Sequence, residues 1–148
     1  MYKNLLVPID GTHIADKAMN SSIELAKQLG ATITAFVAEP TPSLPAVGRQ
    51  ASSIMKENEL HAARTAKHAQ EVLACFEALA RDAGIGFSGH HIQTDRIDDA
   101  IANAAKEHGC DMIVMATHGR GVFGELMLGS RTKSVMARSK LPLLVLHW

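Results

Sequence analysis

Glycines between residues 115 and 130 have two spacings that could place a phosphate against the backbone. Read from Gly119, the letters GRGVFG fit the G-x-G-x-x-G spacing of a dinucleotide-binding turn. Read across the stretch, Gly119 is followed after nine residues by Gly129 and Ser130. Glycine suits both because it has no side chain to hold a ligand away from backbone N–H groups. The two spacings predict different folds, so the surrounding elements must decide between them.

The dinucleotide spacing stands in the wrong place along the chain. That fingerprint belongs at the first strand-to-helix turn of its domain, with an acidic residue about 20 positions later for the ribose. Here the corresponding position is Leu144, between Leu143 and Val145. The sequence also lacks a G-x-x-x-x-G-K-[ST] loop. We therefore interpret GRGVFG as an accidental match.

The wider spacing has a physical rationale. A glycine after a strand lets phosphates approach the backbone, and Gly129-Ser130 can open a helix whose first N–H groups face an anion. The Ser130 hydroxyl can donate to a phosphate, while Arg120 and Arg131 can add positive charge. The alternative is that Ser130 only caps the helix. The spacing by itself leaves both interpretations open.

Apolar runs alternate with amphipathic stretches, which is typical of strands feeding helices in a parallel sheet. Strands are predicted at residues 5–9, 31–38, 87–93, 112–115 and 143–146. Helices are predicted at 15–29, 60–84, 97–107 and 130–138. Gly30 should stop the first helix after Leu29, an apolar stripe from Leu60 should bury the second, and Asp95 should cap the third. The proline-rich segment 40–48 is predicted to be a loop.

This alternation predicts one α/β domain over residues 1–148, with a five-stranded parallel sheet and helices on both faces. Right-handed crossovers then require a reversal in strand order, and ligands bind where it occurs. The order 3-2-1-4-5 would place the first and fourth strands side by side. Asp10, after the first strand, and the glycine stretch, after the fourth, would then flank one crevice.

Composition narrows the class of partner. Fifteen Lys plus Arg balance fifteen Asp plus Glu, so the chain has no net charge and nucleic acid is disfavoured. No segment approaches the ~20 apolar residues of a membrane span, and no signal peptide pattern is seen, so we expect a cytoplasmic protein. Cys75 and Cys110 are too few for a disulfide framework and are expected to be buried free thiols.

Five segments resemble the universal stress protein family and together span the chain. They are LLVPIDGT, FVAEP, CDMIVMATHGRG, LMLGS and LPLLVL. ATP-binding members carry G-x2-G-x9-G-[ST], which Gly119, Gly129 and Ser130 match here, with Ala116 in place of the first glycine. The resemblance implies a Rossmann-like fold of the adenine nucleotide alpha hydrolase type. It also implies a site for ATP with Mg²⁺ or Mn²⁺, whose ligands would come largely from phosphate oxygens and water.

The resemblance also implies roles for individual residues. Asp10, which follows Pro8, would contact the ribose, and the backbone of Val37 would hydrogen-bond adenine. Ala116 would lie against the ribose, where we expect its extra methyl group to be tolerated. The residues at or beside the phosphates would be His118, Gly119, Arg120, Gly129, Ser130, Arg131 and Thr132. For Asp10 the alternative is a helix-capping role at the following turn.

Signatures of catalysis are weak. His118 and Asp10 are the titratable residues expected near the crevice, and neither lies in a catalytic motif. The motifs G-x-S-x-G and H-E-x-x-H are absent, and His90-His91 lacks a third ligand at metal spacing. Binding fits these residues better than hydrolysis, although a slow ATPase is an open alternative.

The leading hypothesis is an ATP-binding regulatory protein that acts as a dimeric, nucleotide-dependent sensor or switch for an unknown protein partner. The alternative is a stress protein that binds no nucleotide and acts through protein contacts, which Ala116 favours. The apolar run of Leu143, Leu144, Val145 and Leu146 would form the homodimer if it lies at a sheet edge, because an edge strand offers unpaired backbone to an identical strand.

Overall fold

A computed structural model of the protein describes residues 1–10, 13–42, 48–117 and 128–147. Its strands are β1 (Asn4–Pro8), β2 (Thr32–Glu39), β3 (Phe87–Gln93), β4 (Met112–Thr117) and β5 (Leu143–His147). Its helices are α1 (His13–Leu29), α2 (Ala51–Asp82), α3 (Ile97–Glu107) and α4 (Ser130–Arg138). Strands and helices alternate along the chain, as the hydrophobic pattern predicts.

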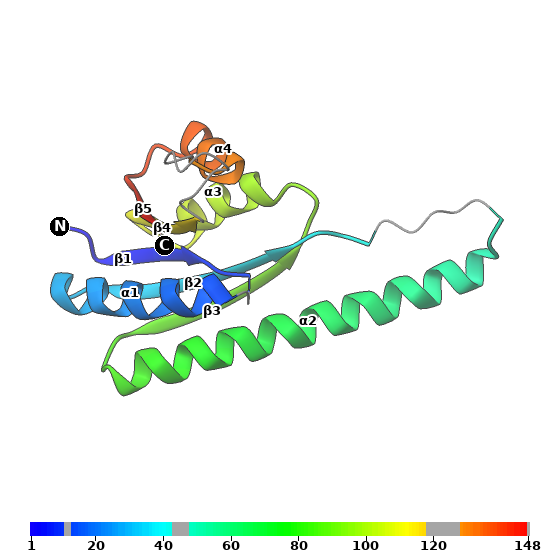
Figure 1. Ribbon diagram of the computed structural model, residues 1–148, viewed down its shortest axis with the longest axis horizontal. Helices are drawn as coiled ribbons and strands as arrows, with labels where there is room; N and C mark the ends of the chain where they lie inside the picture. The colour runs from blue at the N-terminus through cyan, green and yellow to red at the C-terminus, as the bar shows by residue number, and fades with distance from the viewer. Residues whose placement is uncertain (11–12, 43–47, 118–127, 148) are drawn as a thin grey trace.

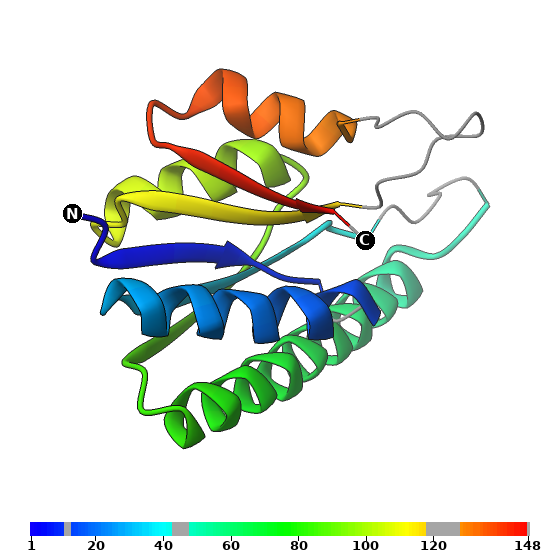
Figure 2. The same cartoon turned by 60° about the vertical axis from the view of Figure 1, so that its left-hand side comes forward.

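The strands form one parallel sheet in the order β3-β2-β1-β4-β5. The predicted order 3-2-1-4-5 is therefore confirmed, and the reversal falls between β1 and β4. Figures 1 and 2 show α1 and α2 on one face of the sheet and α3 and α4 on the other. Because both faces are covered, the central strands are apolar at nearly every position.

Two hydrophobic cores fill the spaces between the sheet and its helices. Leu5 and Val7 of β1 face the core under α1 and α2, while Leu6 between them faces the core under α3 and α4. All three side chains are fully buried. Because side chains on both faces of β1 are buried, the strand lies inside the sheet. The residues that follow β1 therefore lie at the carboxyl edge of the sheet.

The helix α2 is longer than the sequence pattern predicts. It begins at Ala51, not near Leu60, and its N-terminal half extends past the sheet in Figure 1. The expected stripe is buried only farther along, at Ala69, Phe76 and Ala80. Leu60 is 49% exposed. The predicted apolar stripe is therefore confirmed at Phe76 and Ala80 but wrong at Leu60, because the N-terminal half of the helix extends past the sheet.

The residues at the helix ends test further predictions. Gly30 has φ 63°, the left-handed conformation that stops a helix, so its predicted role is confirmed. Leu29, beside it, is exposed and not part of the core. Asp95 does not cap α3, because the capping position is Arg96. The Asp95 carboxylate instead accepts a 2.9 Å hydrogen bond from the Thr41 N–H. Hydrogen bonding to the Thr41 side chain, and then to its N–H, lowers the Asp95 pKa.

The cysteines differ in their surroundings. Cys110 is buried and its pKa is raised by desolvation, as expected of an inert core thiol. Cys75 is exposed, so the prediction that both are buried was wrong. It precedes Phe76, whose ring faces the sheet, and neighbouring helix positions point in different directions. Among the described residues, no helix is long and apolar enough to cross a membrane.

Candidate functional site

A cavity of about 420 Å³ lies at the carboxyl edge of the sheet, where the strand order reverses. Pro8 and Asp10 reach it from the end of β1, and Ala116 reaches it from β4. Gly129 and Arg131 complete it from the start of α4. Residues far apart in the sequence therefore meet in one site, as the topology predicts. The volume lies within the range of small-molecule pockets.

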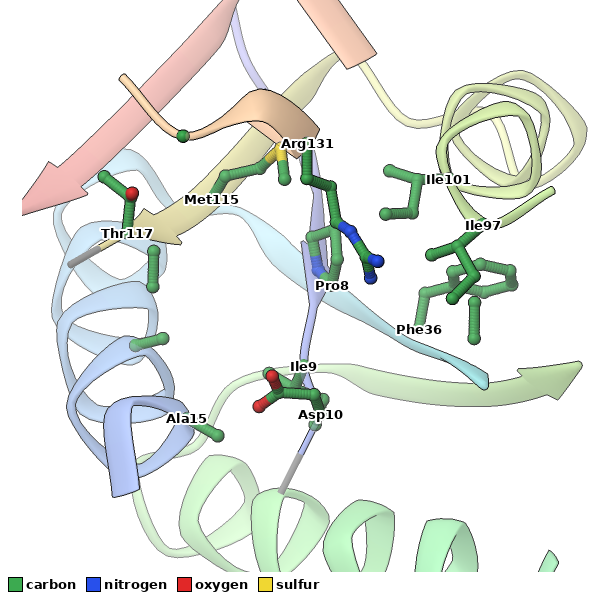
Figure 3. A pocket seen from close by; sticks show the side chains of 14 residues that line it. Pro8, Ile9, Asp10, Ala15, Phe36, Ile97, Ile101, Met115, Thr117 and Arg131 are labelled. Carbon is green, nitrogen blue, oxygen red and sulfur yellow. The ribbon is translucent and has the colours of Figure 1, made fainter. Parts of the chain in front are cut away.

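The cavity has one apolar side and one polar side. Phe36 of β2 and Ile97 and Ile101 of α3 form the apolar side. Figure 3 shows the Asp10 and Thr117 side chains on the other side, at the ends of β1 and β4. An apolar wall beside convergent polar groups suits a ligand with a planar, weakly polar end and a polar end.

Gly129 is favoured by limited space and not by its backbone conformation. Its φ of −57° is accessible to any residue. A Cβ atom at this position would lie 3.3 Å from the Thr117 Oγ1, closer than such contacts comfortably allow. A side chain here would therefore crowd the end of β4 and the polar side of the cavity.

The N-terminus of α4 adjoins the cavity. Gly129 is its capping residue, and its carbonyl accepts the first helical hydrogen bond, from the Lys133 N–H at 3.1 Å. The preceding N–H groups of the first turn have no partner within the helix. Such groups, together with the helix dipole, form a natural site for an anion.

Three predicted residues lie beside the cavity without contributing side chains to it. Ser130 is exposed and is the first residue of α4, so it is not the helix cap. Thr132 is 2% exposed. Val37 is fully buried against the core under α1 and α2, although its neighbours Phe36 and Ala38 line the cavity. Any role of these residues in ligand binding would involve backbone groups or, for Ser130, a rotated hydroxyl.

The sequence did not predict an ion pair beside the cavity. The Arg131 Nε lies 3.5 Å from the Asp98 Oδ1 of α3. Nearby, the Asp99 carboxylate accepts a hydrogen bond from Arg138 Nε at 2.6 Å, and the same arginine lowers the Asp99 pKa. These pairs connect α3 to α4. No sequence pattern identifies them, since their partners are far apart in the chain.

The apolar lining was only partly foreseen. Ile97 and Ile101 lie in the predicted third helix, but an apolar helix pattern does not distinguish a core from a cavity wall. Phe36 and Ala38 read equally well as strand core. His118, Gly119 and Arg120, all predicted near the phosphates, lie outside the described residues.

Metal ligands and catalytic groups are sparse in what the structure describes. Within those residues, no three His, Cys, Asp or Glu side chains gather to hold a metal ion. Asp10 is the acidic side chain of the cavity lining. This arrangement can bind a polar ligand, and it offers Asp10 as a hydrogen-bond acceptor for sugar hydroxyls.

Comparison with known proteins adds independent evidence. The sequence matches the Universal stress protein family over residues 1–147. A universal stress protein of Thermus aquaticus is 31% identical over 148 aligned residues, which cover 99% of this chain and 100% of the relative. A universal stress protein of Methanocaldococcus jannaschii is 28% identical over 154 aligned residues, which cover 98% of this chain and 82% of the relative.

Solved structures share the fold. A universal stress protein in complex with cAMP has a TM-score of 0.66 at 21% identity, covering 99% of this chain and 97% of its own. One from Archaeoglobus fulgidus in complex with dAMP has a TM-score of 0.61 at 19% identity, covering 97% of each chain. One from Arabidopsis thaliana with AMP bound has a TM-score of 0.62 at 14% identity, covering 98% of this chain and 91% of its own.

The family match spans almost the whole chain, and the sheet has the Rossmann-like parallel topology that the resemblance implies. This chain belongs to the universal stress protein family.

Proposed function

We propose that this protein binds adenine nucleotides in the cavity between β1, β4 and α4 and acts as a nucleotide-dependent regulatory protein. The observation that carries the proposal is the cavity itself, which is lined by Asp10, by the start of α4 and by an apolar wall. Structures with the same fold hold AMP, cAMP and dAMP, which supports the ligand class.

The proposed arrangement assigns each part of ATP to a part of the cavity. The base packs against Phe36 and Ile97, within reach of the Val37 backbone. The ribose hydroxyls donate hydrogen bonds to the Asp10 carboxylate, beside Pro8 and Ala116. An apolar wall favours a base, and a carboxylate favours hydroxyl donors, so the order follows from the chemistry of the lining.

The phosphates in this proposal approach the first turn of α4. The N–H groups of that turn and the Ser130 hydroxyl serve as donors, and Thr132 contributes through its backbone. Gly119, with His118 and Arg120 beside it, is assigned here by the resemblance. Mg²⁺ or Mn²⁺ would bind mainly through phosphate oxygens and water, which requires few protein ligands.

Calorimetric titration with ATP and magnesium tests this proposal. Nucleotide-stripped protein should bind about one equivalent with Kd in the micromolar range, about −8 kcal/mol. Gly129→Asp should abolish binding, because its side chain crowds Thr117 and its carboxylate repels phosphates. Asp16→Asn is the matched control, since Asp16 is an exposed residue of α1 that does not line the cavity.

Two outcomes would count against nucleotide binding. One is a folded wild-type protein that binds no ATP even at millimolar concentration. The other is unchanged binding in Gly129→Asp. Either result would favour the second candidate, a stress protein that acts only through protein contacts. Ala116 is the observation that keeps this candidate open, because its methyl group lines the cavity.

Regulation is the remaining part of the proposal. ATP would stabilise one surface of the protein, and a protein partner would bind that surface preferentially. A stress response, a homodimer and a cytoplasmic location belong to the same proposal. Measuring phosphate release over time distinguishes slow ATP hydrolysis from binding alone. If the protein hydrolyses ATP, this release should disappear in Asp10→Ala.

A further inference from the structure

Arg131 is the cationic side chain of the cavity lining, as far as the described residues show. It belongs to the first turn of α4, close to where an anion would meet the helix N-terminus. In Figure 3 its guanidinium extends into the cavity, between Pro8 and Ile97. The positive charge that a ligand would meet in the cavity therefore depends on which other side chains contact the Arg131 guanidinium.

Asp98 is the ion-pair partner of Arg131. The Arg131 Nε lies 3.5 Å from the Asp98 Oδ1, and the two side chains are 53% and 30% exposed. Asp98 does not line the cavity but a neighbouring polar hollow. Within the described part of the chain, no hydrogen bond engages the terminal nitrogens of Arg131. By contrast, Arg138 is bonded through Nε to Asp99 and through Nη1 to Ser134.

This geometry has an electrostatic consequence. A carboxylate on the Nε side holds the guanidinium toward α3 and offsets its charge, so an anion in the cavity meets a weaker field than a lone arginine would create. The effect must grow with the number of phosphate charges. It must be negligible for an uncharged nucleoside.

We propose that Asp98 is a specificity-determining residue that, by holding Arg131, reduces the preference of the cavity for nucleotides with more phosphates. The proposal rests on nucleotide binding in the cavity. With Asp98 in place, the site recognises mainly the nucleoside and the first phosphate. Without it, Arg131 turns toward the phosphate chain and favours ATP over AMP.

The experiment is a calorimetric titration of wild type and Asp98→Asn with adenosine, AMP, ADP and ATP. Asp98→Asn should tighten ATP binding about fivefold and AMP binding about twofold at low salt, and leave adenosine unchanged. The gain for ATP should shrink at about 0.5 M salt, because exposed charges are screened. Thermal melting establishes that each variant is folded.

Asp95→Asn is the matched control. Asp95 lines the same polar hollow as Asp98, but it is bonded to the Thr41 N–H and not to Arg131. It should change ATP affinity by less than about twofold. Combining Asp98→Asn with Arg131→Gln should also remove most of the gain, because the effect acts through the arginine.

Four results would overturn the inference: weaker ATP binding in Asp98→Asn, equal changes for adenosine and ATP, an equal gain in Asp95→Asn, or a full gain without Arg131. Each leaves nucleotide binding itself intact. Failure of the wild type to bind any of the four ligands would instead overturn the proposed function, and this inference with it.

Discussion

At the residue scale, Ala116 would limit how closely the ribose of the proposed nucleotide approaches β4. It is half-buried in β4, where it pairs with Leu146, and its methyl group faces the cavity. One methyl group removes little space from a cavity of about 420 Å³. The departure from the glycine of the family pattern is therefore compatible with a bound nucleotide.

Substitution of Ala116 tests this argument. Ala116→Gly should change ATP affinity less than about threefold and cost about 0.5–1 kcal/mol of stability, since glycine weakens a strand. Ala116→Val should keep the strand stable but reduce affinity more than about tenfold, because two further methyl groups enter the ribose space. Calorimetry and urea unfolding measure the two effects. A large gain in affinity for Ala116→Gly would show that the natural methyl group hinders binding.

At the element scale, the fully buried residues of α2 all lie in its C-terminal half. Phe76 is fully buried and meets the Phe87 ring edge-to-face at 5.3 Å. Leu60, about four turns toward the N-terminus, is 49% exposed, and Met55 is 65% exposed. The C-terminal half therefore holds the helix to the sheet.

Truncation of single side chains should reveal this difference. Phe76→Ala should lower the free energy of unfolding by about 3–5 kcal/mol, because it opens a cavity in the core. Leu60→Ala should lower it by about 0.5 kcal/mol or less, as expected of a surface position. Urea unfolding measures both. Similar losses for the two variants would mean that the N-terminal half of α2 is packed, for example against another copy of the chain.

At the scale of the whole molecule, the sheet has edges at β3 and β5. All residues of β5 are half-buried, and Leu144 and Leu146 remain partly accessible beside α1. An edge strand of this kind can pair with its own copy across a twofold axis. The homodimer proposed from Leu143, Leu144, Val145 and Leu146 uses this edge.

Sedimentation at micromolar concentration tests the dimer. Wild type should sediment as a dimer, and Leu146→Lys should sediment as a folded monomer, because a lysine at the edge opposes pairing. Ile92→Lys is the control at the other edge, where Ile92 is 44% exposed on β3, and it should remain dimeric. A monomeric wild type would contradict the proposal, as would loss of the dimer only in Ile92→Lys.

The sequence by itself was sufficient for the elements, the strand order and the meeting of Asp10 with Gly129. These features follow from local periodicity and from the handedness of crossovers, which act on any chain with this pattern. The same reasoning identified Asp10 on the polar side of the cavity, but not Thr117. It did so because strand ends in a parallel sheet converge without regard to side-chain detail.

Only the tertiary structure decided which side chains are buried and which charges pair. Cys75, Leu29 and Leu60 fit an apolar pattern but are exposed. Asp95 contacts Thr41 instead of capping α3, and Asp98 contacts Arg131 across α3 and α4. Such contacts depend on distances between elements that are remote in the chain. Local sequence carries no information on those distances, because they are set by how the helices settle on the sheet.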